Sequence, residues 1–232
     1  MVSAGLVDTT EMYLKAIYEL EEEGVPPMRA RLVERLEQSK PTVSETVGRL
    51  EKQELLFVDS SRIIQLTDEG RRQATAVMRK HRLAECLLFE VLGMDWELVH
   101  NEACGWEHVM SDALEERIAV AIGKDAHRDP YGNPIPENNS LGPAGDVAGE
   151  AGLISVADYL ADSPAGGTCR LARIGESLQT DEDLLREFAA AGIQPDAELR
   201  LKSGDGVVTL EGESGLPVEI TAPMRAHLQL YS

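Results

Sequence analysis

Hydrophobic residues change their spacing partway along the chain. Up to about residue 122 they recur every three or four positions between charged residues, a period that predicts amphipathic helices. After residue 152 they fall into short runs separated by Gly and Asp turns, which predict strands. Residues 129–152, which contain Pro130, Pro134, Pro136 and Pro143, have neither period, so we expect an extended or mobile linker there.

The first 66 residues predict a helix-turn-helix followed by a hairpin. The sequence Asp8-Thr9-Thr10-Glu11 resembles a capping box before a first helix. Residues 29–38 and 41–53 each carry one apolar stripe, and Ser39 between them suits an N-cap. This spacing fits a helix-turn-helix and an ordinary helical hairpin equally well. Two apolar runs around the polar tip at 59–62 predict a β-hairpin, which favours a winged helix.

The expected second helix of this motif carries small polar residues and an Arg on its outer face, where they could approach base edges. The tip of the hairpin adds an Arg that could reach phosphate or the minor groove. The predicted DNA-contacting residues are Arg29, Ser39, Lys40, Pro41, Thr42, Ser44, Glu45, Thr46, Arg49 and Arg62.

Charge argues against this interpretation at first. The net charge is −19, and residues 1–75 carry 10 basic and 14 acidic residues. Since DNA affinity follows the number of Lys and Arg contacts to phosphate, a DNA reader here needs local positive charge on one face. Bound cations would help to supply it.

The middle of the chain predicts a helical block. Residues 67–92 form one expected long helix ended by Gly93, and further helices are expected from Asp95 and over 112–122. This block has more apolar surface than one small domain needs, which favours dimerisation. Beyond the linker, four strand-like runs and one helix predict a small, acidic β-barrel, at 168–174, 181–191 (the helix), 198–202, 207–211 and 217–221.

Residues 81–108 concentrate the side chains that bind metals. His81 and Glu85 are four positions apart, as are His100 and Cys104, and Glu107-His108 follow. Helical spacing of three or four places such residues on one face, and mixed N, S and O donors suit a first-row transition metal. A lone helical His is usually structural, but so many donors in phase favour metal binding. A helix rises about 1.5 Å per residue, so His100 and Cys104 lie far enough apart along the helix axis for two neighbouring metal sites.

Catalysis is not expected. The chain has no His-Glu-x-x-His, no Gly-rich phosphate loop and no Gly-x-Ser-x-Gly elbow, so we expect no enzyme. No apolar run is long enough for a membrane span, and the N-terminus lacks the pattern of a signal peptide. Three widely spaced cysteines, Cys86, Cys104 and Cys169, argue against a disulfide framework and for the cytoplasm.

The chain resembles the diphtheria toxin repressor family of metal-dependent transcriptional regulators, and most closely its iron-dependent members. The matching stretches are residues 6–14, 34–39, 41–44, 76–85, 102–104, 106–112 and 132–136. The resemblance implies a multi-domain, mainly α protein. It would comprise a winged helix-turn-helix DNA-binding domain, a helical metal-binding and dimerisation domain, a flexible linker and a C-terminal SH3-like β-barrel, at 1–74, 75–142, 143–152 and 153–232.

The resemblance also implies a homodimer that binds palindromic operators of iron-uptake genes, as one dimer or two per operator, when loaded with two Fe(II) per chain. Co, Ni, Mn or Zn would substitute in vitro. The implied primary ligands are Met12, Cys104, Glu107 and His108, and the implied ancillary ligands are His81, Glu85, His100, Glu176 and Gln179. An anion would contact Arg82 and Asn133, although Asp129 stands where the family has Ser.

Three points stay open at this stage. Helical spacing alone makes Met12 a core side chain, whereas the resemblance makes it a thioether ligand that ties the first helix to the metal. Glu45 and Lys40 replace the Gln and Gly of close relatives, so operator preference can differ. The alternative functions are a manganese-responsive repressor of the same fold and a winged-helix regulator with a structural zinc site.

Overall fold

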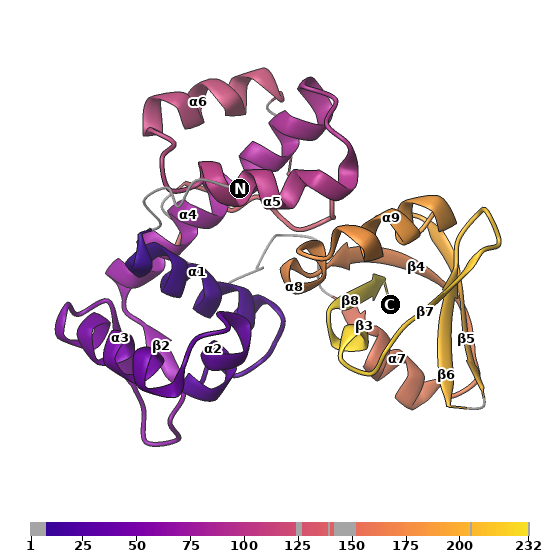
Figure 1. The fold of residues 1–232 in the computed structure, drawn as a ribbon, viewed down its shortest axis with the longest axis horizontal. Coiled ribbons are helices and arrows are strands. Elements are labelled where there is room, and N and C mark those ends of the chain that lie inside the picture. Colours follow the sequence, from indigo (N-terminus) through magenta and orange to yellow (C-terminus); the bar gives the residue numbers. More distant parts are fainter. Residues whose placement is uncertain (1–7, 124–126, 139, 142–151, 205, 232) are drawn as a thin grey trace.

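The computed structural model describes residues 8–123, 127–138, 140–141, 152–204 and 206–231. Figure 1 shows three parts: an N-terminal part of helices and a small hairpin, a helical part beside it, and a C-terminal β part. The predicted linker at 143–152 lies outside the described residues except for Gly152. The exact limits of the three domains stay a prediction.

The N-terminal part is a winged helix-turn-helix, as predicted. It contains α1 (Thr9–Glu22), α2 (Arg29–Arg35), α3 (Lys40–Lys52), β1 (Leu56–Val58) and β2 (Ile64–Leu66). The two strands pair antiparallel. Asp8 and Ser39 cap α1 and α3, because their side chains accept hydrogen bonds from the backbone N–H groups of Thr10 and Thr42. The predicted apolar stripes meet in one core with no solvent exposure at Leu14, Ile17, Leu32, Val43, Val47, Leu50 and Ile64.

Thr46 was predicted on the outer face of α3, and that placement is wrong. Its exposed fraction is 9%, whereas its neighbour Glu45 is exposed. Thr46 follows Val43 by three positions and precedes Val47, so the helical period turns it toward the same core.

The helical part is built on α4 (Asp68–Cys86), which begins directly after the hairpin and packs against both α1 and α5 (Trp96–Trp106). The helix predicted over 67–92 continues beyond Cys86 as a π-helical turn, η1 (Leu87–Val91), and Gly93 follows with a φ of 66°. The remaining helix is α6 (Asp112–Ala121). One rigid helix therefore links the N-terminal part to the helical part.

Apolar side chains are exposed on η1, α5 and α6 and in the turn after α5. They include Val91, Leu92, Leu98, Val109, Leu114 and Val120. Exposed apolar residues concentrated on neighbouring elements are typical of a protein interface. These exposed residues lie in the helical part, for which the sequence predicts dimerisation.

The prediction of an extended or mobile segment is wrong for its first part. Residues 131–136 are buried, and Tyr131 donates a hydrogen bond from its hydroxyl to the carbonyl of Trp96. The backbone N–H of Ile174 in turn donates to the carbonyl of Tyr131. Proline removes regular secondary structure but not burial, so this stretch packs between the helical part and the C-terminal sheet.

The C-terminal part is an antiparallel sheet consistent with an SH3-like domain. Its strands are β3 (Leu153–Ser155), β4 (Gly166–Ile174), β5 (Glu198–Gly204), β6 (Val207–Glu211), β7 (Pro217–Glu219) and β8 (Leu228–Tyr231), in the order β3-β8-β4-β5-β6-β7. The helices are α7 (Val156–Asp162), α8 (Glu176–Gln179), α9 (Glu182–Ala191) and a 3-10 turn, η2 (Met224–Ala226). The four predicted strands and α9 are confirmed, whereas β3, β8, α7 and α8 were missed.

Figure 1 shows α8 at the centre of the molecule, beside α1 and α5. This short helix, which follows β4, therefore places the C-terminal part next to the other two parts. No helix among the described residues is long and apolar enough to cross a membrane.

We predict that Gly70→Ala destabilises the N-terminal part by about 1–3 kcal/mol, because a Cβ there would lie 1.9 Å from the carbonyl oxygen of Leu55. Gly48→Ala is the matched control, since nothing lies within 4 Å of its Cβ position in α3. The control should be neutral or stabilising by up to about 1 kcal/mol, because Ala favours helix over Gly. Denaturant unfolding followed by circular dichroism measures both, and equal midpoints for the two variants would contradict the packing described.

Candidate metal centre

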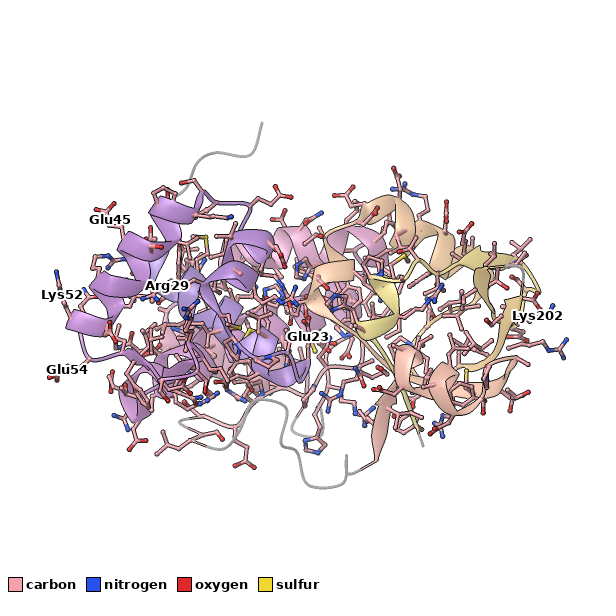
Figure 2. All side chains as sticks on the ribbon, turned by 90° about the horizontal axis from the view of Figure 1, so that it is seen from below. Glu23, Arg29, Glu45, Lys52, Glu54 and Lys202 are labelled. Carbon is pink, nitrogen blue, oxygen red and sulfur yellow. The ribbon has the colours of Figure 1, made fainter. Side chains whose placement is uncertain are left out.

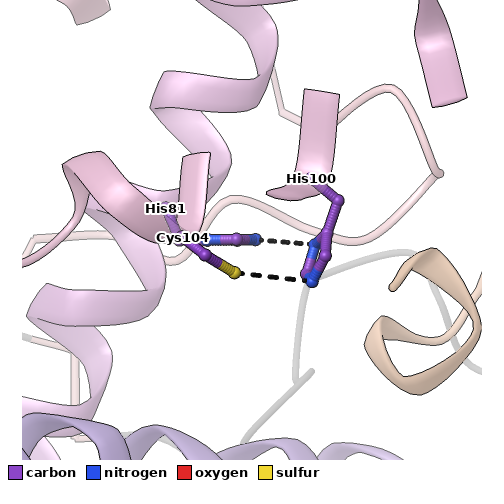
Figure 3. Close-up of side chains that lie close together, drawn as sticks. All are labelled: His81, His100 and Cys104. Atoms are coloured by element: carbon purple, nitrogen blue, oxygen red, sulfur yellow. Dashed lines mark hydrogen bonds between the residues drawn. The ribbon is translucent and has the colours of Figure 1, made fainter. Parts of the chain in front are cut away.

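Four potential ligands converge from three helices onto one buried point. The donor atoms of His81, Glu85, His100 and Glu176 all lie within 4.8 Å of one another. His81 Nε2 lies 2.8 Å from a Glu85 oxygen and 3.2 Å from His100 Nδ1. Figure 3 shows His81 and His100 facing each other from α4 and α5. The fourth member, Glu176, comes from the start of α8.

The burial of this cluster leaves carboxylate charge without enough partners. His81 and Glu85 have no solvent exposure, and Glu176 is 4% exposed. Oxygens of Glu85 and Glu176 and the amide oxygen of Gln179 are buried without a hydrogen-bond partner among the described residues. The same Glu176 oxygen lies 3.2 Å from His81 Nε2, an ion-pair contact within the cluster. Such groups cost free energy unless a cation meets them, so this donor set fits a divalent transition metal.

The other predicted ligand set lines a cavity of about 790 Å³ between α1, α2, α5 and the C-terminal part. Met12, Cys104, Glu107 and His108 all contribute to its wall. His108 Nε2 lies 3.2 Å from one oxygen of Glu107, and its Nδ1 lies 2.7 Å from Glu11 on α1. A residue of α1 therefore meets the turn directly after α5, where Glu107 and His108 lie.

The two predicted ligand sets are joined rather than separate. His81 Nδ1 lies 2.6 Å from Glu107, and the sulfur of Cys104 lies 3.6 Å from His100 Nε2 (Figure 3). The donor atoms of His81, His100 and Cys104 form a second close group. Sequence spacing did not predict this grouping, because it cannot show how α4 and α5 cross.

Lys15 on α1 is a residue that the sequence analysis missed. Its ammonium lies 2.8 Å from Glu107, 3.2 Å from His81 Nδ1 and 3.9 Å from the sulfur of Cys104. The residue is only 7% exposed. Its position beside Leu14 on the inward face of α1 was the available signal, since a buried lysine needs partners.

The electrostatics of the centre prepare anionic donors. Burial alone would raise the pKa of Cys104, but Lys15 and His100 lower it to about 5. Burial also opposes ionisation of Glu107, yet Lys15 and His81 lower its pKa to about 2. Burial disfavours the charged form of His100, but Cys104 and Glu85 raise its pKa to about 10. The sulfur is therefore a thiolate at neutral pH, whereas His100 must release a proton before it can ligate a metal.

The residues predicted to bind an anion already face protein acceptors. Arg82 is fully buried and donates to the carbonyl of Pro134 and to Glu22 and Glu176. Asp129 lies 3.6 Å from the guanidinium of Arg82 and accepts a hydrogen bond from the Asn133 amide at 3.0 Å. The anion itself stays a prediction, and a carboxylate of the chain lies at the position between its two predicted contacts.

The predicted DNA-contacting residues lie on α2, α3 and the hairpin tip. Figure 2 shows Glu45 and Lys52 of α3 at the edge of the molecule farthest from Lys202 in the C-terminal part. Most members of the predicted set are exposed, namely Ser39, Lys40, Pro41, Thr42, Ser44, Glu45, Arg49 and Arg62. Arg29 is half-buried at the start of α2, and Arg62 has a φ of 65° in the hairpin turn. Residues of α1 and α2 line the cavity that also contains Cys104, Glu107 and His108, and α2 packs against α3, so these helices connect the predicted DNA-contacting face to the metal ligands.

Two family models match the chain. One is described as iron dependent repressor, N-terminal DNA binding domain, and matches residues 5–62. The other is described as iron dependent repressor, metal binding and dimerisation domain, and matches residues 67–137. The two models cover the winged helix-turn-helix and the helical part.

Similar curated proteins include the diphtheria toxin repressor of Corynebacterium diphtheriae, which is 49% identical over 93% of this chain and 93% of its own length. The iron-dependent repressor IdeR of Mycobacterium tuberculosis is 48% identical over 87% of this chain and 86% of its own. A solved manganese-dependent transcriptional repressor in complex with manganese has a TM-score of 0.74 at 33% identity, covering 97% of this chain and 100% of that chain. The IdeR of T. acidophilum has a TM-score of 0.72 at 27% identity, covering 97% and 98%.

We predict that iodoacetamide alkylates Cys104 before Cys86 and Cys169. Cys104 is partly exposed and its pKa is about 5, whereas burial raises the pKa of Cys169 to about 11 and raises that of Cys86 further. A thiolate is the reactive form, so the rate at Cys104 should stay level from about pH 7 to about pH 9 and fall toward pH 5. Peptide mass spectrometry measures the rate at each cysteine. A Cys104 rate that climbs through about pH 8.5 would show an ordinary thiol.

Proposed function

We propose, from the premise that the chain belongs to the family of iron-dependent repressors, that it represses transcription as an Fe(II)-activated dimer bound to operator DNA. The family resemblance noted in the sequence is confirmed by relatives at 46–49% identity over most of the chain. The observation that carries the proposal is the buried cluster of donors that joins α4, α5 and α8 beside α1. We propose that its DNA sites are palindromic operators of iron-uptake genes and that it acts in the cytoplasm.

We propose two Fe(II) ions per chain. The primary ion would be held by Met12, Cys104, Glu107 and His108, which share one cavity wall. The ancillary ion would be held by His81, Glu85, His100, Glu176 and Gln179, and the unpartnered buried oxygens of three of these residues support it. Each ion would supply positive charge and coordination bonds.

The positions of the metal ligands explain how metal binding would change the orientation of the DNA-reading face. Met12 and Glu11 lie on α1, and α1 packs against α4 and α2. A ligand on α1 that binds the same ion as donors on α5 and in the turn after it would hold the winged helix-turn-helix in one orientation. In a dimer this would favour the state whose two α3 helices are about 34 Å apart, one turn of DNA. A ligand that binds one state better shifts the population toward it.

Because the chain is so acidic, DNA binding needs positive charge near the surface that contacts the phosphates. We propose that α3 enters the major groove with its exposed Ser39, Thr42 and Ser44 near base edges, while Arg62 meets the backbone. Lys40 would offset the charge of Glu45, which is unfavourable near phosphate unless it accepts from a cytosine amino group. Two divalent ions per chain would reduce the net charge of −19 by up to about four units.

The dimer would use the exposed apolar residues of η1, α5 and α6. The manganese-responsive alternative is not favoured, since both matching family models describe iron dependent repressors and relatives named iron-dependent repressor IdeR are 46–48% identical. A winged-helix regulator with a structural zinc site would bind DNA in the presence of a chelator. The proposal assigns the chain no catalytic step.

We predict that the wild-type protein shifts a palindromic iron-box duplex with Fe(II) or Co(II) and that a chelator abolishes the shift. Cys104→Ser should weaken this metal-dependent binding at least about tenfold, because a serine hydroxyl is a far poorer ligand than the thiolate. Cys169→Ser is the control, since Cys169 is buried in the C-terminal sheet. Electrophoretic shifts over a metal titration measure the effect, and a shift that survives chelation would overturn the proposal.

We predict that Met12→Ala also weakens metal-dependent operator binding, while the metal-free chain keeps its fold. The reason is that Met12 would be the ligand on α1. Without its thioether, no coordination bond would join the DNA-reading part to the primary ion. Fluorescence anisotropy of a labelled operator measures the change. Unchanged metal-dependent affinity would mean that Met12 is only a core side chain, as helical spacing alone suggests.

We predict that Glu85→Gln combined with Glu176→Gln lowers the metal content from two ions per chain to one. Both side chains would belong to the ancillary site, and the double change removes two charges from it. Glu116→Gln on the exposed face of α6 is the matched control. Elemental analysis after equilibrium dialysis gives the number of metal ions per chain. A ratio of two in the double variant would exclude these carboxylates as ligands.

A further inference from the structure

Lys15 places a positive charge inside the centre where the donor atoms gather. It projects from α1, three positions after Met12, and is 7% exposed. Its ammonium reaches Glu107, His81 Nδ1 and Cys104 at 2.8, 3.2 and 3.9 Å. These three atoms belong to the donor sets of both proposed ions, so one ammonium contacts both sets.

Without metal, the anionic donors of the centre need the positive charge of Lys15 to offset their mutual repulsion. The carboxylates of Glu85, Glu107 and Glu176 are almost completely buried, and the Cys104 thiolate lies close to them at the wall of the cavity. Anions held together in a poorly solvated space repel one another and require a nearby cation. Lys15 is the lysine that reaches Glu107 and Cys104, and without it their charges would oppose folding of the metal-free chain.

We propose that Lys15 is a tethered cation that competes with the divalent metal for Glu107, Cys104 and His81. This inference rests on the proposed function, because it concerns the affinity of that centre for its metal. The ammonium stabilises the metal-free chain by occupying the donors, and it must withdraw before those donors can ligate an ion. Lys15 therefore sets the metal concentration at which the repressor switches.

The fold provides a place for the ammonium to withdraw to. Lys15 and Glu19 both line the cavity of about 790 Å³, and the Glu19 carboxylate already lies 3.9 Å from the ammonium, one helical turn away. Rotation of the flexible lysine stem would exchange Glu107 for Glu19 without moving α1. The displaced charge would then remain paired.

A purely structural ion pair predicts a different behaviour. If Lys15 stays on Glu107 in both states, its removal lowers stability and leaves metal affinity unchanged or weaker. If Lys15 competes, its removal lowers the stability of the metal-free chain and raises metal affinity. The sign of the change in affinity therefore separates the two roles.

The test compares Co(II) binding by wild type, Lys15→Gln, Lys15→Met and Lys15→Arg at one fixed pH. Isothermal titration calorimetry gives the Kd, the visible absorption of Co(II)–thiolate reports ligation by Cys104, and thermal unfolding gives the metal-free midpoint. Lys80→Gln is the matched control, since its ammonium lies next to His81 in sequence but pairs with Asp112 at 2.8 Å.

We expect Lys15→Gln and Lys15→Met to bind Co(II) tighter by on the order of tenfold to a hundredfold, equivalent to about 1.4–2.8 kcal/mol, with a lower metal-free midpoint. Lys15→Arg keeps the charge and should stay within about threefold of wild type, as should Lys80→Gln. If Lys15→Gln fails to fold, Lys15→Met provides the same comparison of Co(II) affinity.

Two outcomes overturn different claims. An unchanged or higher Kd in the neutral variants, with normal Co(II)–thiolate absorption in wild type, would refute competition by Lys15 and leave the repressor proposal intact. Failure of the wild-type chain to bind Co(II) at all would refute the proposed function itself.

Discussion

Unbalanced buried charge at the meeting point of α1, α4, α5 and α8 is the constraint on which the structure depends. Carboxylates of Glu85, Glu107 and Glu176 and the thiolate of Cys104 lie within a few side chains of one another and largely out of water. No apolar packing can compensate for such charges, so cations must do so. The chain itself supplies Lys15, Arg82 and two imidazoles, and divalent metal would complete the balance.

This charge balance also connects the N-terminal part, which has its own core, to the rest of the molecule. The N-terminal part has its own apolar core, whereas the helical and C-terminal parts share a second one. Charged side chains lie between α1 and that second core, as with Arg82 between Glu22 of α1 and Glu176 of α8. Figure 2 places Glu23, at the end of α1, at the centre of the molecule between the two outer parts. An ionic junction responds to bound cations, whereas an apolar junction would not, which suits a protein whose DNA-reading face lies far from its metal.

Much of the fold followed from the sequence because its signals are local. Caps at Asp8 and Ser39, apolar periods of three to four, and turns at Gly and Asp predicted most helices and strands near their observed limits. The same reasoning failed at Thr46, where a polar residue serves the core, and at residues 131–136, where proline-rich sequence is buried. In both cases tertiary packing overrode the local preference, and composition carries no information about that packing.

The sequence by itself determined which donors exist and which helix face each one occupies, since His81 with Glu85 and His100 with Cys104 are fixed by spacing of four. Only the tertiary structure decided that α4 and α5 cross so that His81 touches Glu107, and that α8 brings Glu176 to them from nearly a hundred residues away. It alone also revealed Lys15 among the donors. The reason is that the crossing of helices depends on side-chain packing over the whole interface, which no local period encodes.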